Sequence, residues 1–391
     1  MTAFTFQNGL AAEFSRSKPA VPSKLSAFLI CPLRYAFETE SSPEVVVPRG
    51  PFALRGIALH RTVERYFGRE VPGGRELQAE FLNYIGEEIA RQKEISLTKF
   101  AFTQAGIKGI LSNEQILSAC QLARVILVSH QDKATPNPAV LRMPAMRGGA
   151  PALGSEKAVS SEALDMEGRI DLTYKDATDV VHVVDYKSGN VLDSTGVVKE
   201  SYAIQVAAYA ALVSDTLKPS GLVMDLIGPS SNWSGVYDAA MDRAIKELLS
   251  KLRTALPKHV KVRTELLAMP GHHCSSCAYR LFCPRYKEYM NPTSRGADDE
   301  ALPNDVSGTI LEARQSGGLI TLRILTDKGT KASIAGVPLE TYPALHTGQR
   351  LRAASLGTFD LAGKTAFPAN FYLFRADNPR LSAFEAMMLS T

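Results

Sequence analysis

Two short segments that combine apolar and charged residues constrain the fold of this chain more than any other feature. The first run, DMEGRIDLTY, covers residues 165–174, and the second, VVHVVDYKSG, covers residues 180–189. The polar stretch KDATD lies between them. Alternating apolar and polar positions on both sides of a short polar turn predict a β-hairpin.

The second strand of this hairpin would end in a cluster of charges. Residues two apart in a strand point to the same face, so Asp185 and Lys187 project together while Tyr186 points the other way. The turn can bring Asp171 of the first strand beside Asp185. Charges at the end of an apolar strand need compensation. A surface hairpin with ordinary charges is one interpretation, and a metal site is the other.

The metal interpretation gives these residues a chemistry. Two carboxylates that converge with a lysine suit a hard cation, Mg²⁺ or Mn²⁺. Such a metal would activate water and polarise a phosphoryl oxygen, while Lys187 would hold the water or the scissile phosphate.

The segments around the hairpin are predicted to be mainly helical. Apolar spacing predicts an amphipathic helix over residues 55–67, with His60 at the edge of its apolar stripe, and further helices over 76–132. Residues 134–155 are rich in Pro and Gly and predict a loop. After the hairpin we expect a helix over 200–213, a strand near 221–228 and a basic helix over 238–256.

The five cysteines are unevenly placed. Cys274, Cys277 and Cys283 lie within ten residues, whereas Cys120 lies in a hydrophobic helix and is expected to be a buried core thiol. Cys31 is the better candidate for a fourth ligand, because it lies at a predicted helix–helix junction and precedes a proline, as Cys283 does. No secretory signal or membrane span is visible, so we expect a cytoplasmic protein, in which clustered cysteines indicate a metal or iron–sulfur site.

The hairpin motif GRIDLTY…VVDYKSG resembles the catalytic hairpin of the PD-(D/E)XK nucleases, specifically their RecB-like branch. GIALH resembles the upstream helix of that branch, which implies that His60 is a metal ligand. QVAAY resembles its Q-x-x-x-Y motif, which implies that Gln205 and Tyr209 contact DNA or steady the lysine. An acid often precedes the first carboxylate strand in the family, and Glu156, Glu162 and Glu167 remain open as candidates. The resemblance covers roughly residues 22–288.

The resemblance also implies which groups bind the metals. His60, Asp171 and Asp185 would hold Mg²⁺ or Mn²⁺, with the backbone carbonyl of Tyr186 as a further ligand. LSAFLICPLRYAFE together with CSSCAYRLFCP resembles the iron–sulfur frame of AddB-type and CRISPR-associated members. That likeness implies a [4Fe–4S] cluster on the four cysteines at 31, 274, 277 and 283, which would clip the two ends of the nuclease region together. Zn²⁺ is the alternative occupant, with His272 or His273 as substitute ligands.

The expected architecture is therefore α/β, with a restriction-endonuclease-like mixed sheet flanked by helices and closed by an iron–sulfur clamp. We expect a nuclease domain over residues 1–290 with a helical insertion at about 76–155, and a linker over 291–308. A small all-β domain over 309–391, barrel-like and of OB type, would follow. Phe359, Phe367, Phe371, Tyr372 and Phe374 offer bases a stacking surface there, although core packing explains such aromatics as well.

The expected function is a metal-dependent DNA nuclease that acts on single-stranded or end-containing DNA, in exonuclease or endonuclease mode. The alternative is a non-catalytic iron–sulfur or zinc DNA-binding subunit. Residues 246–288 hold nine Lys or Arg and three Glu, which favours either a DNA-tracking surface or a solvated helix face. No G-x-x-x-x-G-K-[ST] loop is present, so a separate helicase or other ATPase, or a defence-system subunit, is the expected partner, in repair or antiviral defence.

Overall fold

The structure is a computed structural model of the 391-residue chain. It describes residues 13–40, 51–67, 69–95, 111–131, 154–271, 273–274, 277, 279–280, 283–289, 306–339, 345–354, 357–358, 371–373 and 383–387.

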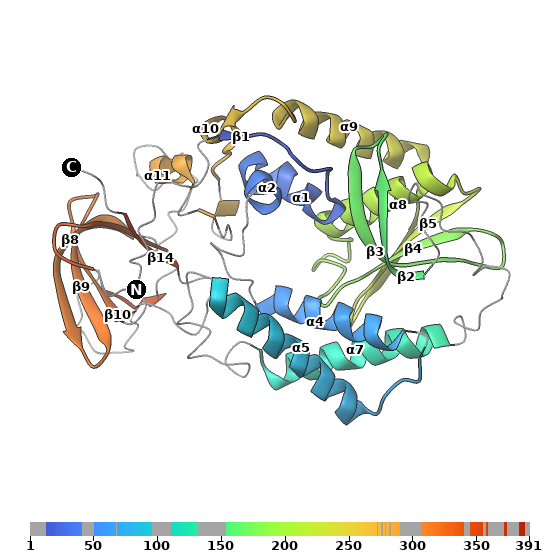
Figure 1. Ribbon diagram of the computed structural model, residues 1–391, viewed down its shortest axis with the longest axis horizontal. Coiled ribbons are helices and arrows are strands. Elements are labelled where there is room, and N and C mark those ends of the chain that lie inside the picture. The colour runs from blue at the N-terminus through green and yellow to red at the C-terminus, as the bar shows by residue number, and fades with distance from the viewer. Residues whose placement is uncertain are drawn as a thin grey trace.

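A five-stranded mixed sheet forms the centre of the larger part of the molecule (Figure 1). Its strand order is β2-β3-β4-β5-β6, and only the β4–β5 pair is parallel. The strands are β2 (Gly154–Ser161), β3 (Met166–Lys175), β4 (Val181–Tyr186), β5 (Leu222–Ile227) and β6 (Asn232–Val236). This is the mixed sheet that the α/β prediction requires.

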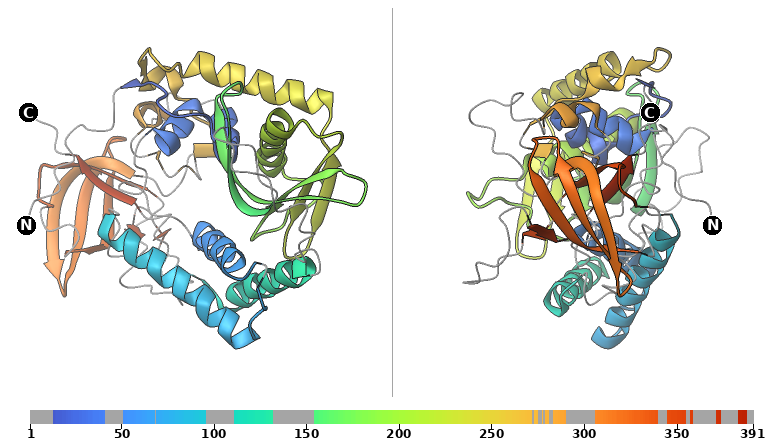
Figure 2. Two further views of the ribbon diagram at one scale, coloured as in Figure 1. Left: turned by 45° about the vertical axis from the view of Figure 1, so that its right-hand side comes forward. Right: turned by 90° about the vertical axis from the view of Figure 1, so that its left-hand side faces the viewer.

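Helices cover the sheet in two layers, which Figure 2 shows apart from each other. One layer holds α1 (Leu25–Ile30), α2 (Pro32–Thr39), α8 (Glu200–Leu217) and α9 (Ala239–Ala255). The other holds α4 (Pro51–Tyr66), α5 (Gly74–Ile95) and α7 (Asn113–Gln131). Val181 and Val183 join the first core, whereas Val184 and Tyr186 join the second, so β4 has the alternation that its sequence predicts.

The hairpin and the crossover that follows it determine where the charged residues lie. β3 and β4 pair antiparallel, from Lys175 opposite Val181 to Leu172 opposite Val184. Asp176 closes the turn by accepting hydrogen bonds from the backbone N–H of Thr178 and of Val180. α8 then connects β4 to the parallel strand β5, because parallel neighbours need a crossover connection. The helix therefore passes close to the end of β4.

Segments from the two ends of residues 13–289 meet beside α2. Cys31 is both the C-cap of α1 and the N-cap of α2, and Pro32 is the first residue of α2, as predicted. Strand β1 (Glu13–Phe14) pairs with β7 (Val262–Arg263), which precedes the short helix α10 (Thr264–Leu267). The rings of Phe37 and Tyr279 stack with centroids 5.1 Å apart. Helix α11 (Pro284–Tyr289) follows the last cysteine.

A separate seven-stranded sheet with its own apolar core lies beyond residue 305. Its order is β12-β13-β10-β9-β8-β11-β14, in which only β10 and β13 are parallel. The strands are β8 (Val306–Ser316), β9 (Leu319–Thr326), β10 (Lys331–Pro338), β11 (Arg350–Ala354), β12 (Gly357–Thr358), β13 (Phe371–Leu373) and β14 (Ala383–Met387). A closed OB-type barrel stays a prediction, and the side chains of the five aromatic candidates lie outside the described residues.

The predicted helices and strands named here are of the type that the structure has, but their boundaries differ. α4, α8, β5 and α9 lie where helices and a strand were expected. β2 and β6 were missed, and β2 begins at Gly154, inside the segment assigned to a loop. β8 begins at Val306, inside the expected linker, whose earlier residues lie outside the described ones. Within the described ranges, no helix is both long enough and apolar enough to cross a bilayer.

Candidate active site

Two buried carboxylates lie at the end of the hairpin. Asp171 on β3 and Asp185 on β4 are 7% and 2% exposed. The backbone N–H of Tyr186 donates to Asp171 Oδ2 at 2.6 Å, which fixes this carboxylate against the neighbouring strand. Burial raises the pKa of Asp185 to about 6, and the nearby charge of Asp171 adds to the rise, although Lys187 opposes it. The site therefore concentrates negative charge where solvent cannot screen it.

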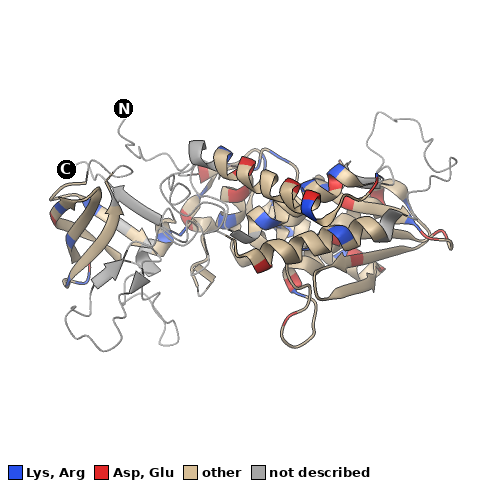
Figure 3. Cartoon of the chain, turned by 90° about the horizontal axis from the view of Figure 1, so that it is seen from below, with Lys and Arg blue, Asp and Glu red and all other residues tan. Residues whose placement is uncertain are grey.

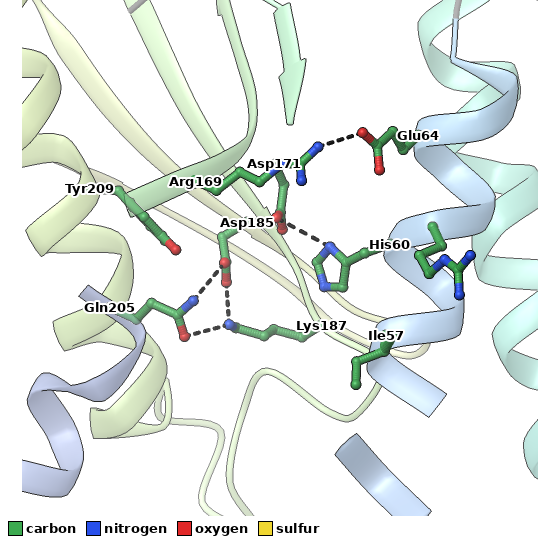
Figure 4. A pocket seen from close by; sticks show the side chains of 10 residues that line it. Ile57, His60, Glu64, Arg169, Asp171, Asp185, Lys187, Gln205 and Tyr209 are labelled. Atoms are coloured by element: carbon green, nitrogen blue, oxygen red, sulfur yellow. Dashed lines mark hydrogen bonds and ion pairs between the residues drawn. The ribbon is translucent and has the colours of Figure 1, made fainter. Parts of the chain in front are cut away.

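Lys187 is held over Asp185 by a residue from the crossover helix (Figure 4). Its Nζ lies 2.5 Å from Asp185 Oδ2 and donates to Gln205 Oε1 at 2.8 Å. Gln205 Nε2 donates to Asp185 Oδ1 at 3.0 Å, so the amide bridges both partners. The Tyr202 ring lies 4.8 Å from the ammonium group and adds a cation–π contact. The lysine is thus fixed in position before any ligand arrives.

His60 reaches the same site from the opposite helical layer. It lies on α4, and its Nδ1 is 3.2 Å from Asp171 Oδ1. The side chain is partly exposed, at 31%. The imidazole therefore lies beside one carboxylate and at the edge of the open space, as a residue that faces a ligand would.

The ring of Tyr209 accounts for the glycine at position 168, which begins the stretch GRID (residues 168–171). A Cβ at Gly168 would lie 2.8 Å from Tyr209 Cε1 and 3.1 Å from Pro22 Cδ. Real Cβ atoms do not approach carbon this closely, so the ring of Tyr209 occupies space that only a glycine leaves open. Tyr209 lies four positions after Gln205 on α8, and both side chains face the site.

These residues line one cavity of about 320 Å³. Sequence reasoning identified His60, Asp171, Asp185, Lys187, Gln205 and Tyr209, and it missed the other four: Ile57, Arg61, Glu64 and Arg169. A signal existed, because Ile57 and Glu64 lie three and four residues from His60 on the same helix face, and Arg169 lies two residues before Asp171.

One further acid lines the cavity, and it lies on α4. Glu162 and Glu167 are exposed, and the side chain of Glu156 lies outside the described residues. The further acid that lines the cavity is Glu64.

The comparisons with known proteins bear on this arrangement. The sequence model of the PD-(D/E)XK nuclease superfamily matches residues 20–284, which span the helices, the sheet and the cavity. The chain belongs to the PD-(D/E)XK nuclease superfamily. No curated protein matches it significantly. Eleven solved chains match, among them one titled "Crystal structure of SSO0001", which is 10% identical with a TM-score of 0.26. That alignment covers 60% of this chain and 97% of the other.

PD-(D/E)XK nucleases generally use divalent metals, and the donor chemistry here fits one. Asp185 Oδ2 is buried and accepts no hydrogen bond of good geometry, although Lys187 Nζ is close. Two carboxylates and an imidazole are donors that Mg²⁺ or Mn²⁺ accepts. Within the described residues, no group of three or more His, Cys, Asp or Glu is arranged as a coordination shell. His60 instead contacts Asp171, and Lys187 contacts Asp185.

The four cysteines expected to act together lie close enough in this PD-(D/E)XK protein for their charges to interact, but within the described residues they are not arranged as a metal-binding group. All five cysteines are free thiols. Burial raises the pKa of Cys274 to about 12 and that of Cys283 to about 11, and charges on the neighbouring thiols, Cys31 among them, add to both rises. The backbone N–H of Met269 donates to Cys31 Sγ at 3.5 Å, and the N–H of Gly271 donates to Cys274 Sγ at 3.4 Å.

Backbone N–H groups thus donate to two of the four sulfur atoms. His273 contacts the Met269 carbonyl through Nε2, and His272 lies outside the described residues. Cys120 lies apart in α7 as a buried thiol, as expected, and burial raises its pKa to about 11.

The basic segment 246–288 is partly compensated by acidic side chains around it. Three of its lysines form ion pairs: Lys246 with Asp242, Lys251 with Glu247 and Lys258 with Asp165. α9 packs on α8, on the side away from α4 (Figure 1). Figure 3, which views the molecule from the side of α4, α5 and α7, shows basic and acidic residues interspersed along those helices as well. These pairs favour the solvated helix face, and DNA tracking by this segment stays a prediction.

Proposed function

We propose that this protein is a metal-dependent DNA nuclease of the RecB-like branch, which hydrolyses phosphodiester bonds at the cavity between α4, α8 and the hairpin. The observation that carries the proposal is the convergence of two buried carboxylates with a fixed lysine on one cavity wall. Burying such charges is costly unless a ligand uses them, which makes the cluster a candidate functional site.

Each residue has a separate role in this proposal. Asp171, Asp185 and His60, with the backbone carbonyl of Tyr186, would hold Mg²⁺ or Mn²⁺. The metal supplies Lewis acidity and lowers the pKa of water at the site. Lys187 would donate a hydrogen bond to the attacking water or to a non-bridging phosphate oxygen. Gln205 would keep the ammonium group in place once the carboxylate turns to the metal, because its amide oxygen already accepts from Lys187.

The direct test is cleavage of labelled DNA with Mg²⁺ or Mn²⁺. Asp185→Asn should abolish activity, since an amide is a poor ligand for a hard cation. Asp179→Asn is the matched control, because Asp179 lies on the same hairpin and is 71% exposed. An inactive wild type would overturn the proposal and favour a non-catalytic DNA-binding subunit. Equal activity in Asp185→Asn would overturn the site assignment.

The substrate that we propose is single-stranded or end-containing DNA. Assays on linear single-stranded, blunt double-stranded and circular single-stranded DNA separate the modes. Exonucleolytic action would leave circles intact, whereas endonucleolytic action would open them. Cleavage of closed duplex circles as fast as linear single strands would contradict the proposed preference.

We also propose that Cys31, Cys274, Cys277 and Cys283 bind a structural [4Fe–4S] cluster. Their mutual proximity, although Cys31 and Cys274 are 243 residues apart, supports a clamp at the meeting point of the chain ends. Metal analysis of anaerobically purified protein, with its visible spectrum, tests this. About four irons per chain are expected for the cluster, and one zinc per chain would identify the alternative occupant.

We also propose a role for the region beyond residue 305 and for a partner ATPase. The seven-stranded sheet would act as an OB-like or protein-docking module, and a separate helicase would supply unwound strands. Affinity purification from the source organism that returns no ATPase would contradict the partner assignment.

A further inference from the structure

Two arginines at the rim of the cavity are each paired with a glutamate. An Arg169 guanidinium nitrogen contacts the Glu64 carboxylate, which links β3 to α4 across the opening (Figure 4). Arg61 pairs with Glu87 at 2.7 Å and lies over the Tyr84 ring at 4.0 Å. Arg169, Glu64 and Arg61 all line the same cavity as the carboxylate pair. The two arginines are therefore placed beside the site, in defined orientations.

The pair between Arg169 and Glu64 lies next to the proposed metal ligands. Arg169 is two residues before Asp171 on β3, and Glu64 is one helical turn after His60 on α4. The side chains of Arg169 and Glu64 are 55% and 46% exposed. Exposed ion pairs contribute only about 0.2–1 kcal/mol, so another anion can replace Glu64 at small cost.

The charges that line the cavity are balanced. Three cations face three carboxylates: Arg61, Arg169 and Lys187 against Glu64, Asp171 and Asp185. A DNA phosphate would therefore meet no net attraction while Glu64 remains in place beside Arg169. Arginine binds phosphate with two parallel hydrogen bonds, which a single carboxylate contact at the surface does not outweigh.

We propose that Arg169 and Glu64 form an exchangeable pair, in which a DNA backbone phosphate next to the scissile one displaces Glu64 from Arg169. This inference rests on the proposed function and names the group that anchors its substrate. Glu64 competes with DNA for Arg169, and Arg61, held by Tyr84 and Glu87, adds a second cation at the rim. Removal of Glu64 and removal of Arg169 must then change DNA affinity in opposite directions.

The test is equilibrium binding of a fluorescein-labelled single-stranded oligonucleotide, measured by anisotropy in EDTA so that no cleavage occurs. Arg169→Gln should weaken binding about tenfold, as expected for loss of a charge-assisted hydrogen bond of roughly 1.5 kcal/mol. It should also reduce the slope of log K against log salt by about 0.7, the value for one phosphate contact on a single strand.

Glu64→Gln should tighten binding about two- to fivefold, which corresponds to release of an exposed ion pair. The double variant should match Arg169→Gln, because Glu64 acts only through Arg169. Lys175→Gln and Asp179→Asn are the matched controls, since these residues form an exposed ion pair of 2.7 Å on the same hairpin but do not line the cavity. Thermal melts verify that every variant is folded.

Two results would overturn the inference while leaving the proposed function intact. If Glu64→Gln and Arg169→Gln weaken binding equally, the ion pair has only a structural role, in which it holds α4 against β3. If both variants bind DNA as tightly as the control variants do, while the wild type binds and cleaves DNA, the arginines at the rim do not contact phosphate. A wild type that neither binds nor cleaves DNA would instead overturn the proposed function itself, and this inference with it.

Discussion

Replacing Asp185 with asparagine should stabilise the metal-free protein at neutral pH. Asn keeps the shape of the side chain and can still accept the hydrogen bond from Gln205 Nε2. It removes a carboxylate that is almost fully buried and that lies near a second carboxylate, Asp171. The substitution therefore removes an electrostatic cost from the folded state.

The size of the effect follows from the pKa of Asp185, which burial raises from 3.8 to about 6. The shift is about two pH units, which corresponds to about 3 kcal/mol. Because the folded state holds the proton more tightly than the unfolded state, this cost is absent below pH 3.8. It grows as pH rises and is complete above about pH 6. The Asn variant should thus exceed the wild type by up to about 3 kcal/mol at pH 7 and by little at pH 4.

The assay is urea unfolding of both proteins in EDTA from pH 4 to pH 8. The difference between their free energies of unfolding cancels the distant titrating groups and reports Asp185 together with the neighbours that its charge is coupled to. Saturating Mg²⁺ or Mn²⁺ should stabilise the wild type at pH 7 and leave the variant nearly unchanged, because a ligand that binds only the folded state adds to stability. Asp179→Asn should follow the wild type at each pH.

A constant difference across the pH range, or a variant less stable than the wild type at pH 7, would refute this reasoning. The first result would mean that Asp185 keeps an ordinary pKa in the folded protein. The second would mean that its ion pair with Lys187 outweighs the cost of burial.

Two further substitutions test the packing of the site and the cysteine clamp. Gly168→Ala should lower the free energy of unfolding by about 1–3 kcal/mol, because the new methyl group meets the Tyr209 ring; an unchanged denaturation midpoint would contradict this. Cys274→Ser should abolish bound iron or zinc and lower the melting temperature, whereas Cys120→Ser should keep the metal content of the wild type. Equal metal content in both variants would show that Cys274 is not a ligand.

The hairpin and its crossover helix were predictable because their patterns are local. Strand alternation placed Asp185 and Lys187 on one face, and helix spacing placed Gln205 and Tyr209 on another. The glycine in GRID was a position to note in the sequence, but its reason is the ring of Tyr209, which packs on it from α8. Contacts between elements of this kind do not appear in either local pattern.

The missed elements and residues depend on partners distant in sequence. β6 (Asn232–Val236) has only two large apolar residues and lies at a sheet edge, so it lacks the apolar run that identified β5. Arg169 and Glu64 are 105 residues apart and are ordinary surface charges until α4 packs beside β3. The basic segment 246–288 suggested a DNA surface because its local charge is high. In the fold, however, a lysine such as Lys258 forms an ion pair with a carboxylate distant in sequence, that of Asp165.

The most direct measurement is the rate at which the purified protein degrades labelled single-stranded DNA with Mn²⁺ or Mg²⁺ and with EDTA. The account predicts cleavage by the wild type and by Asp179→Asn that requires the metal, and none by Asp185→Asn, although the latter is folded and more stable in EDTA. Cleavage by Asp185→Asn at the wild-type rate, or cleavage by the wild type in EDTA, would contradict it.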